Sequence, residues 1–193
     1  MTGFTRHRRS RRVIATFSAF EADLLRSLAS QLVELLRNEA AVPQGRDPLE
    51  ALMDFSGPTT EPEDPVLARL FPTAYQHDEE SASEFRRFTE GSLRDGKATA
   101  AGTVIDVLEE AGLPAQLDDD SLVIDVELDE PTAETWMRSF TDIRLALATR
   151  LGVEAGDEDY WHSLPDEDPR AQAHDIYEWV GYLQETVVEA LTS

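Results

Sequence analysis

The stretch that decides the fold runs from Arg12 to Asn38 and reads RVIATFSAFEADLLRSLASQLVELLRN. Its first six residues are rich in β-branched and aromatic side chains, which predicts a short strand over 12–17. Ser18 and Glu21 have the spacing of a capping box, so a helix should begin after this strand and continue to about Asn38. Apolar residues recur along it at helical spacing and predict one core-facing stripe. The residues of that stripe are Phe20, Leu24, Leu28, Leu32 and Leu35.

Four later segments also have the apolar periodicity of helices, namely 79–95, 97–111, 131–151 and 169–191. We expect Asp95-Gly96 to separate the first two helices, and Gly112 to end the second one. Phe85 and Phe88 are the expected apolar centre of the first of these helices.

The stretch Leu122–Leu128 alternates apolar with polar residues, which is the pattern of a half-buried strand. Ala115–Leu117 precedes it across an acidic turn, so the two segments predict a hairpin. The strand over 12–17 is the expected further antiparallel partner. The predicted fold class is therefore mainly α, a single-domain helical bundle with a small antiparallel β-sheet.

Charge divides the chain into a basic arm and an acidic body. Five of the 17 basic residues are arginines within the first 12 positions, whereas the remaining 181 residues carry 12 basic and 39 acidic side chains. We therefore expect a flexible basic arm over 1–11 and one α-rich domain over 12–193. Six of the ten prolines fall at about 43–72, which predicts a loop excursion with short helical turns at 48–55 and 65–71. The arginines of the electrostatic arm are Arg6, Arg8, Arg9, Arg11 and Arg12.

The sequence excludes several classes of site. The chain has no cysteine, so disulfides, thiolate metal sites and thiol switches cannot form. It also lacks the glycine-rich, P-loop, HExxH and GxSxG motifs of common enzyme families. Its four histidines have no helical pair spacing that predicts a metal site. We expect no enzymatic activity, no cofactor and no metal, and a cytoplasmic location, because no apolar run approaches the roughly 20 residues of a membrane span.

The charge of the body disfavours contact with DNA. Proteins gain much of their affinity for DNA when Lys and Arg displace counterions from phosphates, and a formal charge of −27 over residues 13–193 opposes this. The predicted helices over 79–111 and the following hairpin have the order of a winged DNA-binding domain. The second of them, however, carries Asp106, Glu109 and Glu110 and no basic residue over 98–111. Direct DNA contact is therefore left open for the arm alone.

Acidic and aromatic residues gather in 154–168 and on the last predicted helix. Exposed aromatic rings among charges are typical of protein interfaces. The other interpretation is that Trp161 and Trp179 pack against the core while the acids remain solvated. The residues of the predicted partner-binding surface are Asp157, Glu158, Asp159, Tyr160, Trp161, Trp179 and Tyr182.

The helix predicted over 131–151 has an apolar stripe that includes Trp136. Arg144 lies beside this stripe, so we expect its side chain to be partly buried. A partly buried guanidinium needs a polar partner. The expected partner is an acid such as Glu21 or Asp125.

Three features occur together along the chain: the basic N-terminal stretch, the helix FEADLLRSLASQLVELL at 20–36, and the segment DPVLARLFP at 64–72. With the acidic C-terminal helix that bears Trp and Tyr, they resemble the actinobacterial family DUF2017, a domain of unknown function. Its members are also described as oxidative stress transcriptional regulators. The resemblance covers nearly the whole chain.

The resemblance implies a stress-response regulator that acts with the transcription machinery, through a sigma factor or RNA polymerase. The redox sensing ascribed to this family depends on a cysteine pair, so the cysteine-free chain cannot sense stress in that way. Two alternatives stay open. One is a cytoplasmic adaptor for a protease or another stress complex, and the other is a small-molecule-binding or metal-dependent enzyme.

Overall fold

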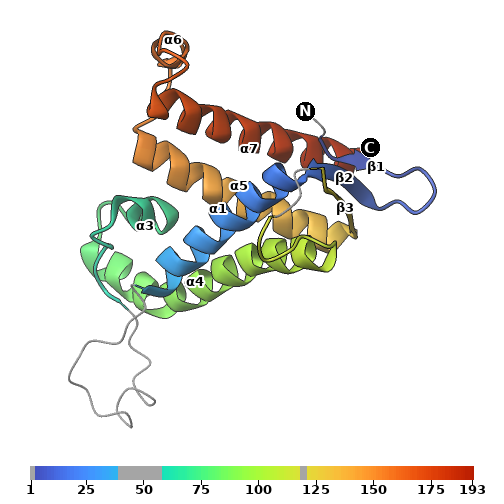
Figure 1. The fold of residues 1–193 in the computed structure, drawn as a ribbon. Coiled ribbons are helices and arrows are strands. Elements are labelled where there is room, and N and C mark those ends of the chain that lie inside the picture. The colour runs from blue at the N-terminus through green and yellow to red at the C-terminus, as the bar shows by residue number, and fades with distance from the viewer. Residues whose placement is uncertain (1–2, 39–57, 118–120) are drawn as a thin grey trace.

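The computed structural model describes residues 3–38, 58–117 and 121–193. Its long helices lie in layers: α5 and α7 are side by side, α1 crosses α5, and α4 packs against α1 and α5 (Figure 1). A small sheet lies at one end of the helices. This architecture confirms the predicted mainly α class. The elements are β1 (Thr5–Arg6), β2 (Val13–Ser18), α1 (Ala19–Asn38), α3 (Pro65–Leu70), α4 (Glu79–Glu110), β3 (Val123–Leu128), α5 (Glu130–Leu151), α6 (Glu158–His162) and α7 (Pro169–Thr192).

The sheet has the order β1-β2-β3, and both pairings are antiparallel. Val13 pairs with Leu128 at one end of the β2–β3 ladder, and Ser18 pairs with Val123 at the other. The alternation predicted for β3 is confirmed, because its even-numbered residues are buried and its odd-numbered residues face solvent. The predicted hairpin with 115–117 is wrong, since β2 offers six residues with a buried face of its own.

The N-terminal segment is anchored rather than a flexible arm. Phe4 is only 3% exposed and its ring meets those of Phe17 and Trp136 edge-on, with centroids 5.7 Å away in each case. Such aromatic contacts add to the free energy gained by burying the rings. Thr5–Arg6 then pairs with β2 as strand β1. The basic residues that follow therefore lie on a hairpin whose base is fixed in the core.

Helix α1 begins with the predicted capping box. The Ser18 amide donates to Glu21 Oε2 (2.8 Å), and the Glu21 amide donates to Ser18 Oγ (3.2 Å). The buried face, however, is rotated away from the predicted stripe, and Phe20 is 71% exposed. Alanines occupy much of the real contact face, because small side chains let α4 approach the backbone of α1 closely. The buried residues of α1 are Ala19, Ala22, Leu25, Ala29, Leu32 and Leu36.

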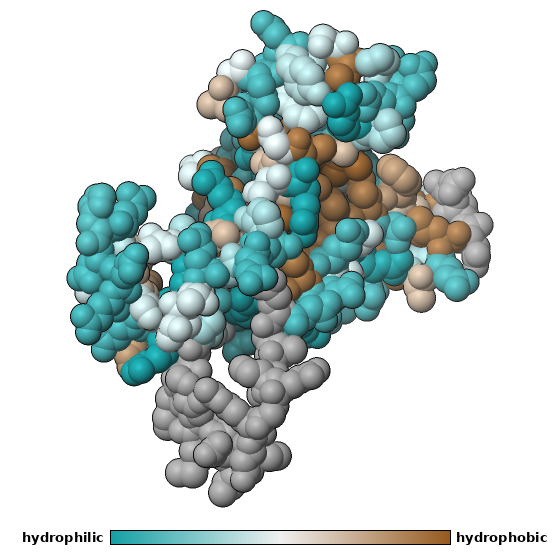
Figure 2. Space-filling view, turned by 90° about the vertical axis from the view of Figure 1, so that its left-hand side faces the viewer, coloured by the Kyte–Doolittle hydropathy of each residue, from teal (hydrophilic) through white to brown (hydrophobic). Residues whose placement is uncertain are grey.

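Of the leucines in the predicted stripe, Leu32 is buried, whereas Leu24, Leu28 and Leu35 are only partly buried. All of them except Leu24 line an apolar groove of about 130 Å³ between α1 and α5. Figure 2 shows one face of the molecule on which apolar side chains gather between hydrophilic surfaces. The apolar face of helix α1 is therefore wider than the face that is buried by packing within the chain. The apolar residues of the groove are Leu28, Leu32, Leu35, Val66, Ile143, Ala146 and Leu147.

Helix α4 is continuous over 32 residues, so the predicted interruption at Asp95-Gly96 is wrong. Both residues are exposed, and helix propensity at two solvent-facing positions is outweighed by packing of the turns on either side. Phe85 and Phe88, the expected apolar centre, are exposed as well. The face that packs inward carries charges in its N-terminal half and small or apolar residues from Ala98 onward.

These charges form a buried network around Glu90. Arg86 Nη1 donates to Glu90 Oε2 and Arg94 Nη2 donates to Glu90 Oε1, both at 2.7 Å. The second nitrogen of each guanidinium reaches main chain elsewhere: Arg86 donates to the Phe71 carbonyl (3.1 Å) and Arg94 to the Leu36 carbonyl (3.2 Å). Glu90 thereby links α4 to the end of α1 and to the residue after α3.

The predicted helical turn at 65–71 is confirmed as α3, which Asp64 caps by accepting from the amides of Val66 (2.7 Å) and Leu67 (3.3 Å). The turn predicted at 48–55 lies outside the described residues. No helix in the described part of the chain is long and apolar enough to cross a membrane.

Replacing Glu90 with Gln should lower the free energy of unfolding by about 3–5 kcal/mol, because two arginines would stay buried without a carboxylate. Urea unfolding followed by circular dichroism measures this. The matched control, Glu84→Gln, removes an exposed acid from the same helix and should change stability by less than about 0.5 kcal/mol. Equally small changes in both variants would contradict the role assigned to Glu90.

Candidate functional site

Residues 154–168 connect α5 to α7 and carry the short helix α6, which stands away from the body of the molecule (Figure 1). We call this segment the acidic knob. Asp157 organises its first turn by accepting hydrogen bonds from the Glu154 amide and from Trp161 Nε1, both at 2.8 Å. These bonds lower the pKa of Asp157, the amide of Glu154 having the larger effect. The carboxylate is therefore charged near neutral pH.

Trp161 anchors the acidic knob to α7. Its side chain is only 5% exposed and stacks flat on His174, with ring centroids 4.7 Å apart and an angle of 4° between the planes. Trp161 is buried outside the main hydrophobic core, so its contacts hold the knob without being part of the bundle interior. The geometry therefore matches the interpretation in which Trp161 is packed inside the protein and is not available to a partner.

The foot of the acidic knob is held by Arg170, near the start of α7. Its guanidinium donates to both oxygens of Asp168 (3.1 and 2.7 Å) and to the Tyr160 hydroxyl (2.9 Å). The hydrogen bond from Arg170 lowers the pKa of Asp168, which also caps α7. Tyr160 keeps 47% of its surface exposed despite this contact.

The predicted partner-binding residues separate into three groups. Glu158, Asp159 and Tyr160 are exposed together on α6, next to half-buried Asp157 and buried Trp161. Trp179 belongs to the main hydrophobic core and cannot offer its ring to a partner. Tyr182 is exposed on α7, less than four turns after the helix begins at Pro169. Of the predicted partner-binding residues, only those in the acidic knob lie next to one another.

A cavity of about 450 Å³ lies beneath the acidic knob. Arg144 from α5 is part of its lining, and this site was not predicted from the sequence. The expected pairing of Arg144 with Glu21 or Asp125 is wrong, because the side chain points toward α7. Its Nη1 donates to Gln184 Oε1 (3.0 Å), and its guanidinium lies 5.0 Å from the centre of the Tyr177 ring.

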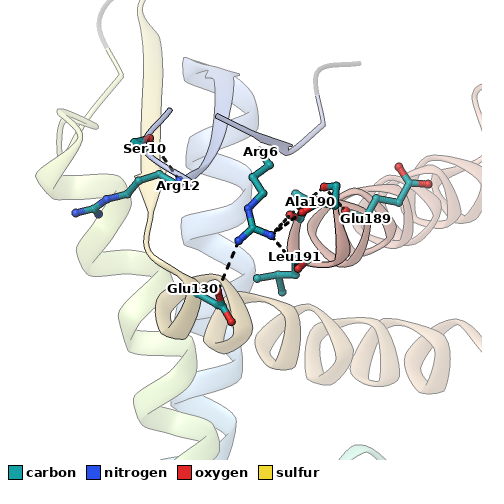
Figure 3. A network of polar contacts seen from close by, with 8 residues as sticks. Arg6, Ser10, Arg12, Glu130, Glu189, Ala190 and Leu191 are labelled. Carbon is teal, nitrogen blue, oxygen red and sulfur yellow. Dashed lines mark hydrogen bonds and ion pairs between the residues drawn. The ribbon is translucent and has the colours of Figure 1, made fainter. Parts of the chain in front are cut away.

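Arg6, one of the predicted arm residues, is a structural side chain. Figure 3 shows its guanidinium reaching the last turn of α7, where Nη1 donates to the carbonyls of Leu191 (3.1 Å) and Ser193 (2.9 Å). Helix α7 has no basic residue of its own in that turn, so Arg6 supplies the cation that helix C-termini favour. Its Nη2 also lies 3.7 Å from Glu130.

The hairpin tip, residues 7–12, presents the other arginines. Arg8, Arg9 and Arg11 are exposed, and none of them forms an ion pair with a described residue. Arg12 lies 3.7 Å from Glu127 on β3. The tip is shaped by its own hydrogen bonds, from the His7 amide to the Arg12 carbonyl (2.8 Å) and from the Arg11 amide to the His7 carbonyl (2.9 Å). Three guanidinium groups therefore stand on an ordered loop.

Within 3–38, 58–117 and 121–193, no group of three or more histidine or carboxylate side chains is arranged to hold a metal ion.

The family described as "Domain of unknown function (DUF2017)" matches residues 1–191. The chain belongs to this family. The resemblance noted in the sequence is thus confirmed, over almost the full length.

Named relatives of the chain occur in mycobacteria. The "Oxidative stress regulator AosR" of Mycobacterium tuberculosis is 28% identical over 193 residues, which cover 92% of this chain and 81% of the relative. The protein of the same name in Mycobacterium bovis has the same identity and coverage. A relative in Mycobacterium leprae, also carrying the name AosR, is 31% identical over 185 residues, with 89% and 78% covered. No solved structure matches the chain. The names of the relatives support a regulatory role in a stress response.

Trp161→Ala should raise amide hydrogen exchange throughout 154–168 by about tenfold or more, because the ring stacking and the bond to Asp157 are both lost. Hydrogen–deuterium exchange with mass spectrometry measures this segment directly. Phe88→Ala is the matched control, since it removes an exposed ring from α4 and should leave the segment unchanged. Unaltered exchange of 154–168 in Trp161→Ala would show that the knob is held in another way.

Proposed function

We propose that this protein is a cytoplasmic, non-enzymatic regulator of a stress response. It acts by protein–protein contact with the transcription machinery, through a sigma factor or RNA polymerase. The names of its relatives support the regulatory part. The observation that carries the contact is the acidic knob, where Glu158, Asp159 and Tyr160 are exposed on a helix that Trp161 fixes in place.

The chemistry of the acidic knob selects a basic partner. The chain has a formal charge of −22, so a cationic protein surface is attracted over a distance and nucleic acid is repelled by most of the molecule. Tyr160 adds a large ring at low cost in conformational entropy, and its hydroxyl is already oriented by Arg170. An ordered acidic surface with one exposed aromatic ring suits docking on a basic patch of a transcription protein.

The hairpin tip supports a second, weaker contact. Arg8, Arg9 and Arg11 project from an anchored hairpin, and guanidinium groups bind phosphate oxygens in pairs of hydrogen bonds. We propose that the tip touches nucleic acid next to the docked protein partner. The alternative role, an adaptor for a protease or another stress complex, uses the same knob and differs only in the partner it meets.

The test of the docking surface is a triple variant, Glu158→Gln/Asp159→Asn/Tyr160→Ala. It should weaken binding to purified RNA polymerase or to a purified sigma factor by about tenfold or more, because both charge and aromatic contact are lost. The control triple Glu109→Gln/Glu110→Gln/Phe88→Ala removes the same kinds of exposed group from α4 and should bind as the unaltered chain does. Biolayer interferometry measures the dissociation constants of both triple variants. Equal weakening, or no binding by the unaltered chain, would refute the proposal.

The hairpin tip is tested with Arg8→Ala/Arg9→Ala/Arg11→Ala. The slope of the logarithm of the binding constant for duplex DNA against the logarithm of salt concentration should become shallower by about two to three. Each phosphate contact that is lost removes the release of about one counterion on binding. Fluorescence anisotropy at several salt concentrations measures the slope. Arg37→Ala/Arg87→Ala/Arg138→Ala removes three other exposed arginines as a control. An identical slope in the two triples would exclude a special role for the tip.

A further inference from the structure

We infer that the cavity beneath the acidic knob binds a small zwitterion, a molecule with a carboxylate at one end and an ammonium group at the other. The cavity holds about 450 Å³ and lies between α5, α7 and the start of the knob. This volume accommodates a ligand of amino-acid size.

The position of Arg144 is fixed on several sides. Its Nη1 donates to Gln184, and Gln184 Nε2 in turn donates to Thr141 Oγ1 (2.6 Å). One face of the guanidinium lies against the backbone of α7 at Gly181, where an added Cβ would come within 3.2 Å of Cζ, Nε and Nη2. Glycine at this helical position therefore makes room for the guanidinium, and Tyr177 lies over it.

The charge of Arg144 lacks a counterion among the described residues. Its partners there, Gln184 and Tyr177, are neutral, and its buried Nε has no hydrogen-bond partner. The other basic side chains that the described structure holds away from solvent all form ion pairs. Half-burying a cation without an anion costs free energy that a bound carboxylate would recover. The paired residues are Arg6, Arg26, Arg86, Arg94 and Lys97.

The other charges around the cavity decide the class of ligand. Three exposed acids, Glu154, Glu158 and Glu178, line it together with half-buried Asp157, and exposed Arg69 and two histidines also border it. Carboxylates therefore outnumber cations at its solvent side, whereas the half-buried guanidinium of Arg144 lies at its inner side. A phosphate or another polyanion would be repelled by these acids, and a simple cation would be repelled by Arg144. A molecule with both charges satisfies both sides. Leu145, Ala148 and Val153 supply apolar wall for the carbon chain between them.

The experiment uses the full chain and a matched set of probes. These are 5-aminopentanoate, pentanoate, which lacks the ammonium group, and pentylamine, which lacks the carboxylate. Isothermal titration should give a dissociation constant of about 1 mM or tighter for the zwitterion and at least about tenfold weaker binding for each of the other two. Equal binding of pentylamine, equal binding of pentanoate, or no binding of the zwitterion would each overturn the inference.

Variants then locate the site. Arg144→Gln should weaken binding of 5-aminopentanoate at least about tenfold, and Gly181→Ala should also weaken it because the added methyl group displaces the guanidinium. Arg138→Gln, on the same helix but exposed, should bind as the unaltered chain does. Circular dichroism before each titration shows that the variants are folded. Unchanged binding in both folded site variants would exclude the cavity, whatever the outcome for the transcription partner.

Discussion

The packing of α1, α3 and α4 depends on one buried carboxylate. Glu90 accepts hydrogen bonds from two arginines inside the protein, and these arginines bind main-chain oxygens at the end of α1 and just after α3. Buried charged groups are tolerated when they are paired and their hydrogen bonds are satisfied, so α4 has one rotation that satisfies the network. That rotation turns Phe85 and Phe88 toward solvent. A polar requirement thus overrides the apolar pattern of this helix.

The two charged features of the molecule lie at opposite ends of α7. The acidic knob precedes its first turn, and the hairpin is bound to its last turn through Arg6. A helix of 24 residues separates these ends by about 36 Å. Both features are fixed by buried aromatic side chains, Trp161 at one end and Phe4 at the other. The acidic knob and the basic hairpin tip are therefore held at a fixed separation along this axis.

The sequence predicts most of the elements but not how they face one another. The capping box at Ser18, the alternation of β3 and the limits of α5 and α7 follow from local rules, and the structure has them. The rotation of α1, the continuity of α4 and the burial of Glu90 depend on contacts between distant segments. The cavity around Arg144 could not be foreseen either, since Gly181 and Gln184 reach it from a helix that follows some 40 residues later. The acidic character of the knob, by contrast, could be predicted from the composition of residues 154–168 alone.

The pairing of Lys97 with Asp142 has a practical consequence. Lys97 is the chain's single lysine, and its Nζ lies 2.6 Å from Asp142 Oδ1 on α5. Burial raises the pKa of Asp142, and the adjoining ammonium group counteracts this. Dyes, biotin esters and bifunctional linkers that attack amines therefore have one side-chain target, and it is engaged in an internal bond. Any such modification of Lys97 has to break this bond between α4 and α5.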